Sequence, residues 1–226
     1  MNAPCGLLLV DKPSGWTSHD AVAVLRRRLP RGCKVGHCGT LDPIATGLLL
    51  LLAGPATRRQ SEFMGLDKVY SGSLRLGVST DTGDLAGKVV RSADVPPLTL
   101  ADFRQLPSGR LEMPAPAYSA VKHKGRRLYE YARAGLEVPV KPRVCQVHEW
   151  KALGYAAPEL AFRLSCSSGT YVRSLAELLG RRLGCGAAVV SLRREAVGNF
   201  RVEQALGAEA LKTIPQEQLL PRFLSA

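Results

Sequence analysis

Motifs typical of metal and cofactor sites are missing from this sequence. Its six cysteines form no Cys-x-x-Cys pair, and no histidine stands at a spacing typical of zinc sites, so a metal site is not expected. There is no Gly-x-x-x-x-Gly-Lys-Ser/Thr loop, no Gly-x-Gly-x-x-Gly after a strand and no Gly-x-Ser-x-Gly elbow. The sequence therefore predicts neither a nucleotide cofactor nor a serine hydrolase.

Long hydrophobic runs are also missing. The longest apolar run is too short to span a bilayer, and the N-terminus has no charged segment leading into an apolar stretch with a cleavage site. Internal repeats and low-complexity tracts are absent as well. We therefore expect a reduced cytoplasmic protein, with no membrane partner, in which most cysteines are core residues.

Acidic residues are scarce relative to basic ones. The chain has 31 Lys and Arg against 19 Asp and Glu, a formal net charge of +12 and a pI near 9.8, which indicates a polyanionic partner. Nucleic acid is the leading interpretation and an anionic membrane the second, because separated basic groups suit regularly spaced phosphates. The basic groups are Arg26 to Arg28, Arg58-Arg59, Lys122 to Arg127, Arg181-Arg182 and Arg193-Arg194.

The length and the hydrophobic pattern indicate a single globular domain spanning residues 1–226. Hydrophobic residues make up 46% of the 226 positions and charged residues 22%, enough for a substantial core. Strand and helix patterns alternate irregularly, which predicts a mixed α/β protein without a doubly wound sheet. Strands are expected at 6–10, 48–52, 68–76, 89–90, 144–150, 160–166 and 188–195, and helices from 17, from 55, at 99–105, from 128 and at 171–183.

Residues 107–127 are rich in Pro, Gly and basic side chains, and they predict a long, mobile, cationic loop. Lys122 lies in its basic part. We expect this loop to contact RNA, with an ordinary solvated basic loop as the alternative.

One carboxylate, Asp42, stands in a segment with unusually many conformational constraints. Residues 36–43 read Gly-His-Cys-Gly-Thr-Leu-Asp-Pro, and Gly36 and Gly39 allow backbone geometries closed to other residues. Pro43 fixes its own φ and biases Asp42 towards an extended conformation. The pattern predicts a rigid loop that aims a single acid; the local alternative is an Asp that caps an ordinary turn.

Taken together, the motifs resemble those of the TruB-type tRNA pseudouridine synthases, which act on uridine 55 in the T loop. The matching blocks occur in the family's order over nearly the whole chain. They are LLLVDKPSG (7–15), GHCGTLDPIATG (36–47), DKVY (67–70), TDTGD (80–84), AYSAVK (117–122), CSSGTYVRS (166–174) and LRR (192–194).

The resemblance implies an α/β (α+β) fold with a mixed, largely antiparallel sheet flanked by helices and loops. It implies an isomerase that turns uridine into pseudouridine in tRNA, extruding the nucleotide from its stack and using no cofactor. The expected partner is the T stem-loop of tRNA, and we expect a monomer without an obligatory protein partner. Residues 201–226 are expected to form a short C-terminal extension, too short for the RNA-binding PUA domain that many relatives append.

The resemblance assigns Asp42 the family's catalytic carboxylate. An ionised Asp beside the ribose has three possible tasks: it attacks C1′, stabilises positive charge there, or removes a sugar proton to give a glycal. The sequence does not choose among them. Arg173 matches the arginine after the Thr-Tyr turn, which is expected to pair with Asp42 and lower its pKa.

Further site residues follow from the same blocks. Tyr70 matches the active-site tyrosine that is expected to stack on the uracil and to accept or relay the C5 proton; without the motif it would be a core aromatic residue. Tyr171 and Leu192 match residues that line the base pocket, with helix-start packing and strand packing as alternatives. Cys38, where many relatives carry Thr or Gly, receives no catalytic role.

Three further residues complete the expected site. Lys12 and Pro13 match a loop that supports the base pocket, with a surface turn as the alternative. His37 matches a histidine that helps to hold the target loop open once the nucleotide is extruded. Two other functions stay open: an RNA-binding or tRNA-folding protein with little isomerase activity, and an acid-dependent glycosidase, which no second carboxylate supports.

Overall fold

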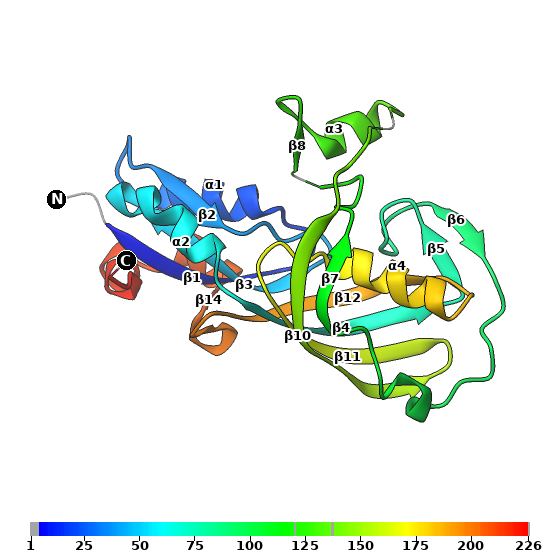
Figure 1. Cartoon of the computed structure of the whole chain (residues 1–226). Helices are drawn as coiled ribbons and strands as arrows, with labels where there is room; N and C mark the ends of the chain where they lie inside the picture. The colour runs from blue at the N-terminus through cyan, green and yellow to red at the C-terminus, as the bar shows by residue number, and fades with distance from the viewer. Residues whose placement is uncertain (1–4, 120, 137, 226) are drawn as a thin grey trace. The chain divides into compact units, whose positions relative to one another are not determined.

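The computed structural model describes residues 5–119, 121–136 and 138–225 (Figure 1). The chain forms two compact units: unit 1 comprises Met1–Tyr70 with Leu192–Ala226, and unit 2 comprises Ser71–Ser191. Ala120, in the predicted basic loop, lies outside the described residues. Within the described ranges, no helix is long and apolar enough to cross a membrane.

Unit 1 is built on a sheet whose strands run in the order β14-β1-β3-β12, with β2 paired to β3 and β13 to β12. The β1–β3 and β2–β3 pairs are antiparallel, whereas β12 joins β3, and β14 joins β1, in parallel. The strands are β1 (Gly6–Lys12), β2 (Val35–Cys38), β3 (Thr46–Ala53), β12 (Ala187–Val197), β13 (Phe200–Arg201) and β14 (Leu206–Gly207). The helices are α1 (Ser18–Arg28), α2 (Gln60–Met64), α5 (Ala208–Thr213) and α6 (Gln216–Leu219), with short 3-10 turns η1 (Gly54–Arg59), η3 (Val202–Gln204) and η4 (Leu220–Arg222).

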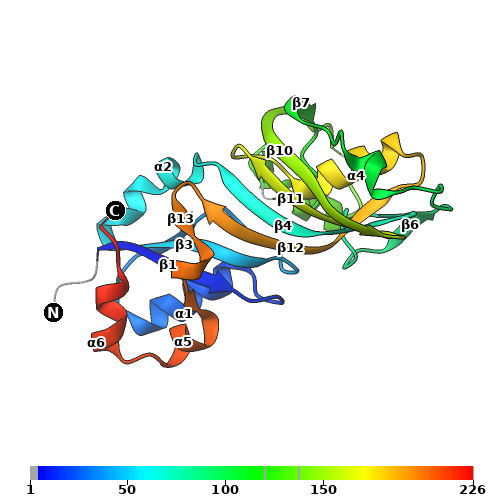
Figure 2. The same cartoon turned by 90° about the horizontal axis from the view of Figure 1, so that it is seen from below.

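The side chains of β1 and β3 are buried on both faces of this sheet, which explains why their apolar runs lack alternation. Leu7 and Leu9 join Leu50 and Leu52 in a buried cluster that includes Phe63 of α2. Figure 2 shows α1 and α5 on one side of β1 and β3 and α2 on the other. Because both faces of the strands are covered, every residue in them can be apolar.

Helix α1 begins where the sequence predicts. Thr17 and Asp20 form the expected capping box: the Asp20 amide donates to Thr17 Oγ1 at 3.1 Å, and the Thr17 amide donates to Asp20 Oδ2 at 2.7 Å. Val22, Leu25 and Leu29 are buried on one face, as their spacing predicts. The cap therefore fixes the start of the helix directly after the β1 turn.

Unit 2 contains strands in the order β12-β4-β11-β10-β7, with separate pairs β5–β6 and β8–β9. Its long strands β10 and β11 pair antiparallel, as do β10 and β7. The strands are β4 (Lys68–Leu76), β5 (Val78–Thr80), β6 (Val89–Ser92), β7 (Gly109–Met113), β8 (Lys122–His123), β9 (Arg126–Arg127), β10 (Arg143–Ala156) and β11 (Glu159–Cys166). The helices are α3 (Leu128–Arg133) and α4 (Val172–Arg182), with a 3-10 turn η2 (Leu100–Phe103).

The predicted fold class is confirmed: the protein is mixed α/β, with mostly antiparallel strand pairs and flanking helices. The expected alternation over 68–76 is also confirmed, since Tyr70, Leu74 and Leu76 are buried. Five of the six cysteines are buried and only Cys5 is exposed, as predicted. The expectation of one catalytic domain over 1–226 stays a prediction.

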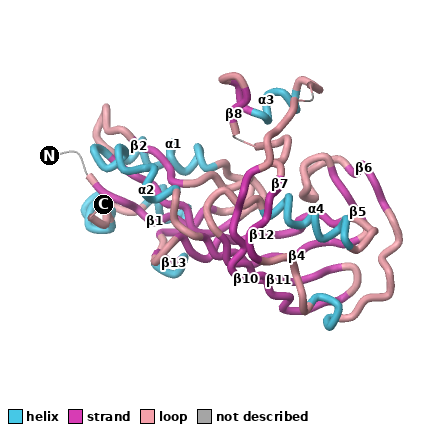
Figure 3. Tube along the Cα trace, in the orientation of Figure 1, coloured by secondary structure: helices cyan, strands magenta, loops and turns pink. Residues whose placement is uncertain are grey.

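Two predictions about loops are wrong in part. Residues 107–127 are not one loop, because β7 pairs with β10 over Gly109–Met113 and β8 and β9 form a short hairpin. In Figure 3 this hairpin and α3 lie beyond the ends of β7 and β10, the strands that flank them in sequence. Residues 36–38 belong to strand β2 rather than to a turn. The C-terminal extension holds two short helices and β14, and Leu224 forms a bridge with Leu7 of β1.

Candidate active site

The Asp42 loop, defined here as residues 39–45, connects β2 to β3. Asp42 is half-buried and Pro43 is exposed. Gly39 has φ +88°, a conformation that favours glycine, as predicted; Gly36 is not among the residues with positive φ, so that expectation is wrong. Strand β2 ends at Cys38 and β3 begins at Thr46, so the loop is held at both ends by one antiparallel pair.

Backbone contacts fix the middle of the loop. Ser18, buried at the start of α1, accepts a hydrogen bond from the Leu41 amide at 2.9 Å, and its hydroxyl lies 3.3 Å from the Leu41 carbonyl. The Ala45 amide donates to the Asp42 carbonyl at 3.0 Å, and the Gly15 amide to the Pro43 carbonyl at 2.8 Å. Contacts from β1, α1 and the turn between them therefore hold the loop, as expected of a rigid loop.

Lys12 is fully buried at the end of β1, so a surface turn is the wrong reading for this residue. Its Nζ donates to the carbonyls of Pro13 (2.9 Å), Trp16 (2.6 Å) and Pro43 (3.5 Å). Burial lowers the pKa of Lys12 from 10.5 to about 8, and the charge of Asp42 partly opposes this shift. Lys12 thus binds the Asp42 loop through the Pro43 carbonyl. Its support of the base pocket stays a prediction.

The buried ammonium of Lys12 makes stability depend on pH. Between about pH 8 and 10.5 the unfolded chain keeps a proton on Lys12 that the folded protein has lost, so the free energy of unfolding rises with pH. We expect Lys12→Met to remove this rise, which has a slope of at most about 1.4 kcal/mol per pH unit. Urea denaturation from pH 7 to 10.5 measures it.

The control for Lys12 is Lys34→Met, which removes an exposed lysine from the same unit. Its unfolding free energy should follow the wild-type pH curve. If Lys12→Met and wild type show parallel curves between pH 8 and 10.5, the buried ammonium does not titrate in this range.

The basic pair Arg193-Arg194 does not form the exposed phosphate-binding group that the sequence suggests. Arg193 is half-exposed and donates to both carboxylate oxygens of Asp11, at 3.1 and 2.8 Å. Arg194 is only 1% exposed and donates to backbone carbonyls next to the Asp42 loop. Neither guanidinium is therefore presented freely to a polyanion.

Arg173 is held in unit 2 by groups that the sequence did not single out. It is 4% exposed, and its Nε lies 3.9 Å from Asp84 Oδ2, also buried. Its Nη1 donates to the Thr82 carbonyl at 2.7 Å and its Nη2 to the Tyr118 carbonyl at 2.9 Å. The pairing of Arg173 with Asp42 stays a prediction.

The turn that holds Arg173 depends on its own glycine. Gly83 has φ +78°, and a Cβ there would lie 2.9 Å from Glu177 Oε1 and 3.1 Å from Arg173 Cβ. Thr82 Oγ1 donates to Asp84 Oδ1 at 2.7 Å, which fixes the carboxylate that faces Arg173. The Thr-Asp-Thr-Gly-Asp block is thus the support of the Arg173 guanidinium.

The remaining predicted site residues have the following places. Tyr70 is 8% exposed on β4, and Leu192 is 8% exposed on β12. Tyr171 is the half-buried N-cap residue of α4. This position is compatible with the alternative role, packing at the start of the helix. His37, half-buried on β2, meets His19 of α1 edge to face, with ring centroids 5.3 Å apart. Pro13 is half-buried directly after β1.

Lys122 is exposed on the β8–β9 hairpin, as a contact to RNA requires. The arginines nearby are stacked on aromatic rings: Arg126 lies 5.0 Å from the centre of the Tyr131 ring, and Arg133 lies 5.4 Å from that of Tyr129. Such pairs hold cationic groups at the surface of a short segment that has few apolar residues of its own.

Cys38 is fully buried in the core of unit 1. Burial raises the pKa of its thiol to about 11, so the sulfur is protonated at neutral pH. The absence of a catalytic role, expected from the sequence, fits this protonation state.

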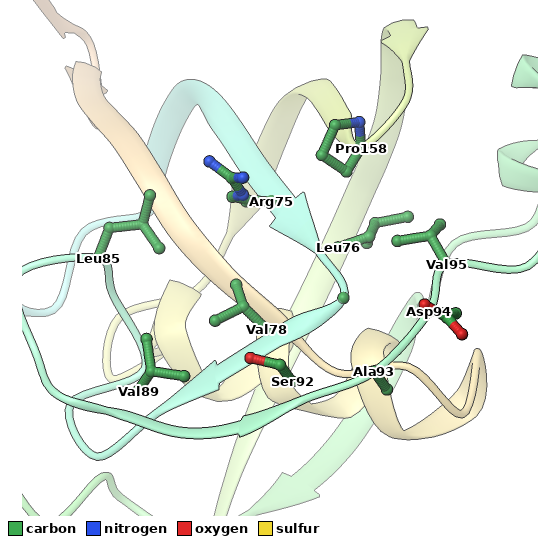
Figure 4. A pocket seen from close by; sticks show the side chains of 11 residues that line it. Arg75, Leu76, Val78, Leu85, Val89, Ser92, Ala93, Asp94, Val95 and Pro158 are labelled. Atoms are coloured by element: carbon green, nitrogen blue, oxygen red, sulfur yellow. The ribbon is translucent and has the colours of Figure 1, made fainter.

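A separate pocket of about 490 Å³ lies in unit 2, between the end of β4 and the β5–β6 pair (Figure 4). Its lining is mostly apolar, and no predicted site residue contributes to it.

Comparisons with known proteins identify the family. A model of the "TruB family pseudouridylate synthase (N terminal domain)" matches residues 26–172, more than half of the chain. The chain belongs to the TruB family. A second TruB model, the "tRNA pseudouridylate synthase B C-terminal domain", matches residues 173–225.

Relatives in the TruB family resemble the chain over most of its length. A protein of Opitutus terrae named tRNA pseudouridine synthase B is 44% identical, and the alignment covers 98% of this chain and 94% of that protein. A protein of the same name from Endomicrobium trichonymphae is 46% identical, over 89% of this chain and 88% of the relative.

Solved structures support the TruB-type fold. A chain in the crystal structure of a Cbf5-Nop10-Gar1 complex has a TM-score of 0.69 and 28% identity over 91% of this chain. One in the archaeal box H/ACA sRNP Nop10-Cbf5 complex has a TM-score of 0.66 and 26% identity over 92% of this chain. This chain covers 53% of each of those two chains.

Sequence reasoning gave no role to three residues that contact either the Asp42 loop or Arg173. Asp84 stands in a quoted block, so its signal was present although no role was given to it. Ser18 directly follows the predicted cap Thr17, but nothing in the sequence indicates that its hydroxyl binds Leu41. Arg194 looks like a surface charge next to Arg193, and only its burial distinguishes it.

Proposed function

We propose that this protein isomerises uridine to pseudouridine at position 55, in the T loop of tRNA. The reaction breaks the N1–C1′ bond, rotates the uracil and joins C5 to C1′. C5 loses its proton and N1 gains one, so the product is an isomer of the substrate. The observation that carries the proposal is the Asp42 loop, in which a half-buried carboxylate stands on a backbone fixed by Ser18, Gly15 and Lys12. Membership of the TruB family supports it.

Asp42 is the proposed catalytic carboxylate. In its ionised form it attacks C1′, stabilises positive charge there, or removes a sugar proton, and each of these tasks needs the carboxylate rather than the acid. Arg173 is proposed to pair with Asp42 and so to stabilise its ionised form. Tyr70 is proposed to stack on the uracil and to relay the C5 proton.

Other residues are proposed to receive the RNA. The target nucleotide must leave its stack, which costs roughly a few kcal/mol, so stacking and phosphate contacts have to offset this cost. Tyr171 and Leu192 line the base pocket in this proposal, and Lys12 with Pro13 supports it. His37 helps to hold the target loop of the RNA open once the nucleotide is extruded, and Lys122 contacts the RNA phosphates. We further propose that the protein acts in the cytoplasm as a monomer on the T stem-loop.

The direct test is tritium release from tRNA carrying 5-tritiated uridine in its T loop. Release at position 55, with pseudouridine in the product, is the expected result. Binding without release would instead indicate an RNA-binding or tRNA-folding protein, and free uracil would indicate a glycosidase. Mapping pseudouridine in total tRNA from cells with and without the protein tests whether the T loop is the only target.

A further inference from the structure

We propose that Arg194 is a positioning residue that fixes the Asp42 loop from both ends. Its Nε donates to the Leu48 carbonyl at 2.7 Å, and its Nη2 donates to the Gly39 carbonyl at 3.1 Å. Gly39 precedes Asp42 and Leu48 follows it, so one guanidinium binds the backbone on both sides of the acid. The inference rests on the proposed function, because it gives that function a further residue.

Burying the charge of Arg194 within the strand β12 costs free energy. The residue is 1% exposed, and within the described ranges no carboxylate lies within ion-pair distance of its guanidinium. Burying a charge with only carbonyl oxygens as partners is unfavourable, and an apolar side chain of similar volume would serve stability at least as well. The arrangement of its donors supplies the reason for an arginine here.

The geometry of the guanidinium suits this task and no other side chain reproduces it. Its planar fork presents several N–H donors in fixed directions, so it can bind two separate carbonyls at once, whereas a lysine offers a single point charge. In the parallel β12–β3 pair, Arg194 stands opposite Gly47. A Cβ on Gly47, which has φ +99°, would lie 2.4 Å from the Arg194 carbonyl oxygen. The close approach of the two backbones brings the fork to the loop.

Arg194 and Lys12 hold different parts of the same loop. Lys12 binds the Pro43 carbonyl within the loop. Arg194 binds the Gly39 carbonyl at the start of the loop and the Leu48 carbonyl in β3, the strand that follows it. The two cations are close enough that the charge of Arg194 lowers the pKa of Lys12. Without Arg194 we therefore expect the ends of the loop to move while the middle stays tethered, so that Asp42 is displaced rather than released.

A displacement of this kind affects the chemical step more than RNA binding. A shift of about 1 Å in a catalytic group can cost about 10²-fold in rate. We expect both Arg194→Lys and Arg194→Met to lower kcat about 10²-fold, with KM for tRNA changed less than about threefold, since the buried guanidinium does not face RNA. The Lys variant should be no better than the Met variant, because charge alone does not restore the fork.

The matched control is Arg201→Met. Arg201 also donates to two backbone carbonyls, those of Gly198 (2.6 Å) and Phe200 (3.3 Å), in the same unit but away from the Asp42 loop. Its kcat should stay within about threefold of wild type. Equal losses in the Arg201 and Arg194 variants would overturn the proposal, because any loss of an arginine–carbonyl contact would then have the same effect.

A second readout does not depend on activity. Amide hydrogen exchange at Leu41 and Ala45, whose amides bind within or next to the loop, should be about tenfold faster in Arg194→Lys. Amides of the β10–β11 pair should be unchanged. If wild type shows no isomerase activity but the exchange result holds, the proposed function fails, while the role of Arg194 in fixing the Asp42 loop stands.

Two outcomes would overturn the role of Arg194. One is wild-type kcat together with wild-type exchange at Leu41 and Ala45 in the Lys variant. The other is loss of the cooperative urea transition in the Lys variant, which would assign Arg194 to the stability of unit 1 rather than to the position of Asp42.

Discussion

Replacing Asp42 by Asn is expected to lower kcat for uridine isomerisation about 10⁴-fold or more, while tRNA binding stays within about threefold of wild type. The amide has the same shape but carries no negative charge, so it cannot attack C1′, stabilise charge there or remove a sugar proton. The loop should keep its conformation, because its described contacts to Ser18, Gly15 and Lys12 are made by its backbone. Single-turnover tritium release measures the rate, and filter binding measures the affinity.

The control for Asp42→Asn is Asp94→Asn, which removes one negative charge from an exposed position in unit 2. It should release tritium at the wild-type rate. If Asp42→Asn retained more than about a tenth of the wild-type kcat, a catalytic role for this carboxylate would be ruled out. In cells that lack the protein, Asp42→Asn should likewise fail to restore pseudouridine in the T loop.

Replacing Arg173 by Met is expected to destabilise the protein by about 3 to 5 kcal/mol, because it leaves the buried carboxylate of Asp84 without its cation. The carbonyls of Thr82 and Tyr118 would lose their donors as well. We also expect a loss of isomerase activity that exceeds what the loss of folded protein explains. Urea denaturation measures the first effect, and kcat in the folded fraction measures the second.

The double variant Asp84→Asn with Arg173→Met separates the two roles of Arg173. It removes both charges, so it should recover part of the stability lost in the single variant. It should not recover activity if Arg173 acts on Asp42 or on the substrate. Recovery of activity together with stability would show that Arg173 serves only the turn that ends at Asp84.

The comparison variant for Arg173 is Arg181→Met on the same helix. Arg181 is 64% exposed, and its ion pair with Glu177 spans 3.9 Å. Its removal should cost less than about 1 kcal/mol. The contrast tests whether burial, rather than the mere presence of an ion pair on α4, determines the cost.

Local patterns predicted the elements whose own side chains specify them. The capping pair Thr17 and Asp20 fixes the start of α1, and the run from Leu48 to Leu52 gives a strand buried on both faces. Strands β2 and β7 were missed. Val-Gly-His-Cys has no alternation, and the alternation in Gly-Arg-Leu-Glu-Met is short, so both segments become strands through their partners β3 and β10. The hydrogen bonds of a short strand depend on a distant segment, which a local window does not contain.

The sequence by itself determined the motifs that identify the family, the mixed α/β class and the position of Asp42 between glycines and a proline. It did so because backbone freedom, capping and hydrophobic runs depend on near neighbours in the chain. Only the tertiary structure decided that Lys12 and Arg194 are buried, and that Arg173 pairs with Asp84. A charged residue looks the same in a sequence whether water or a distant carbonyl solvates it, and folding alone settles which.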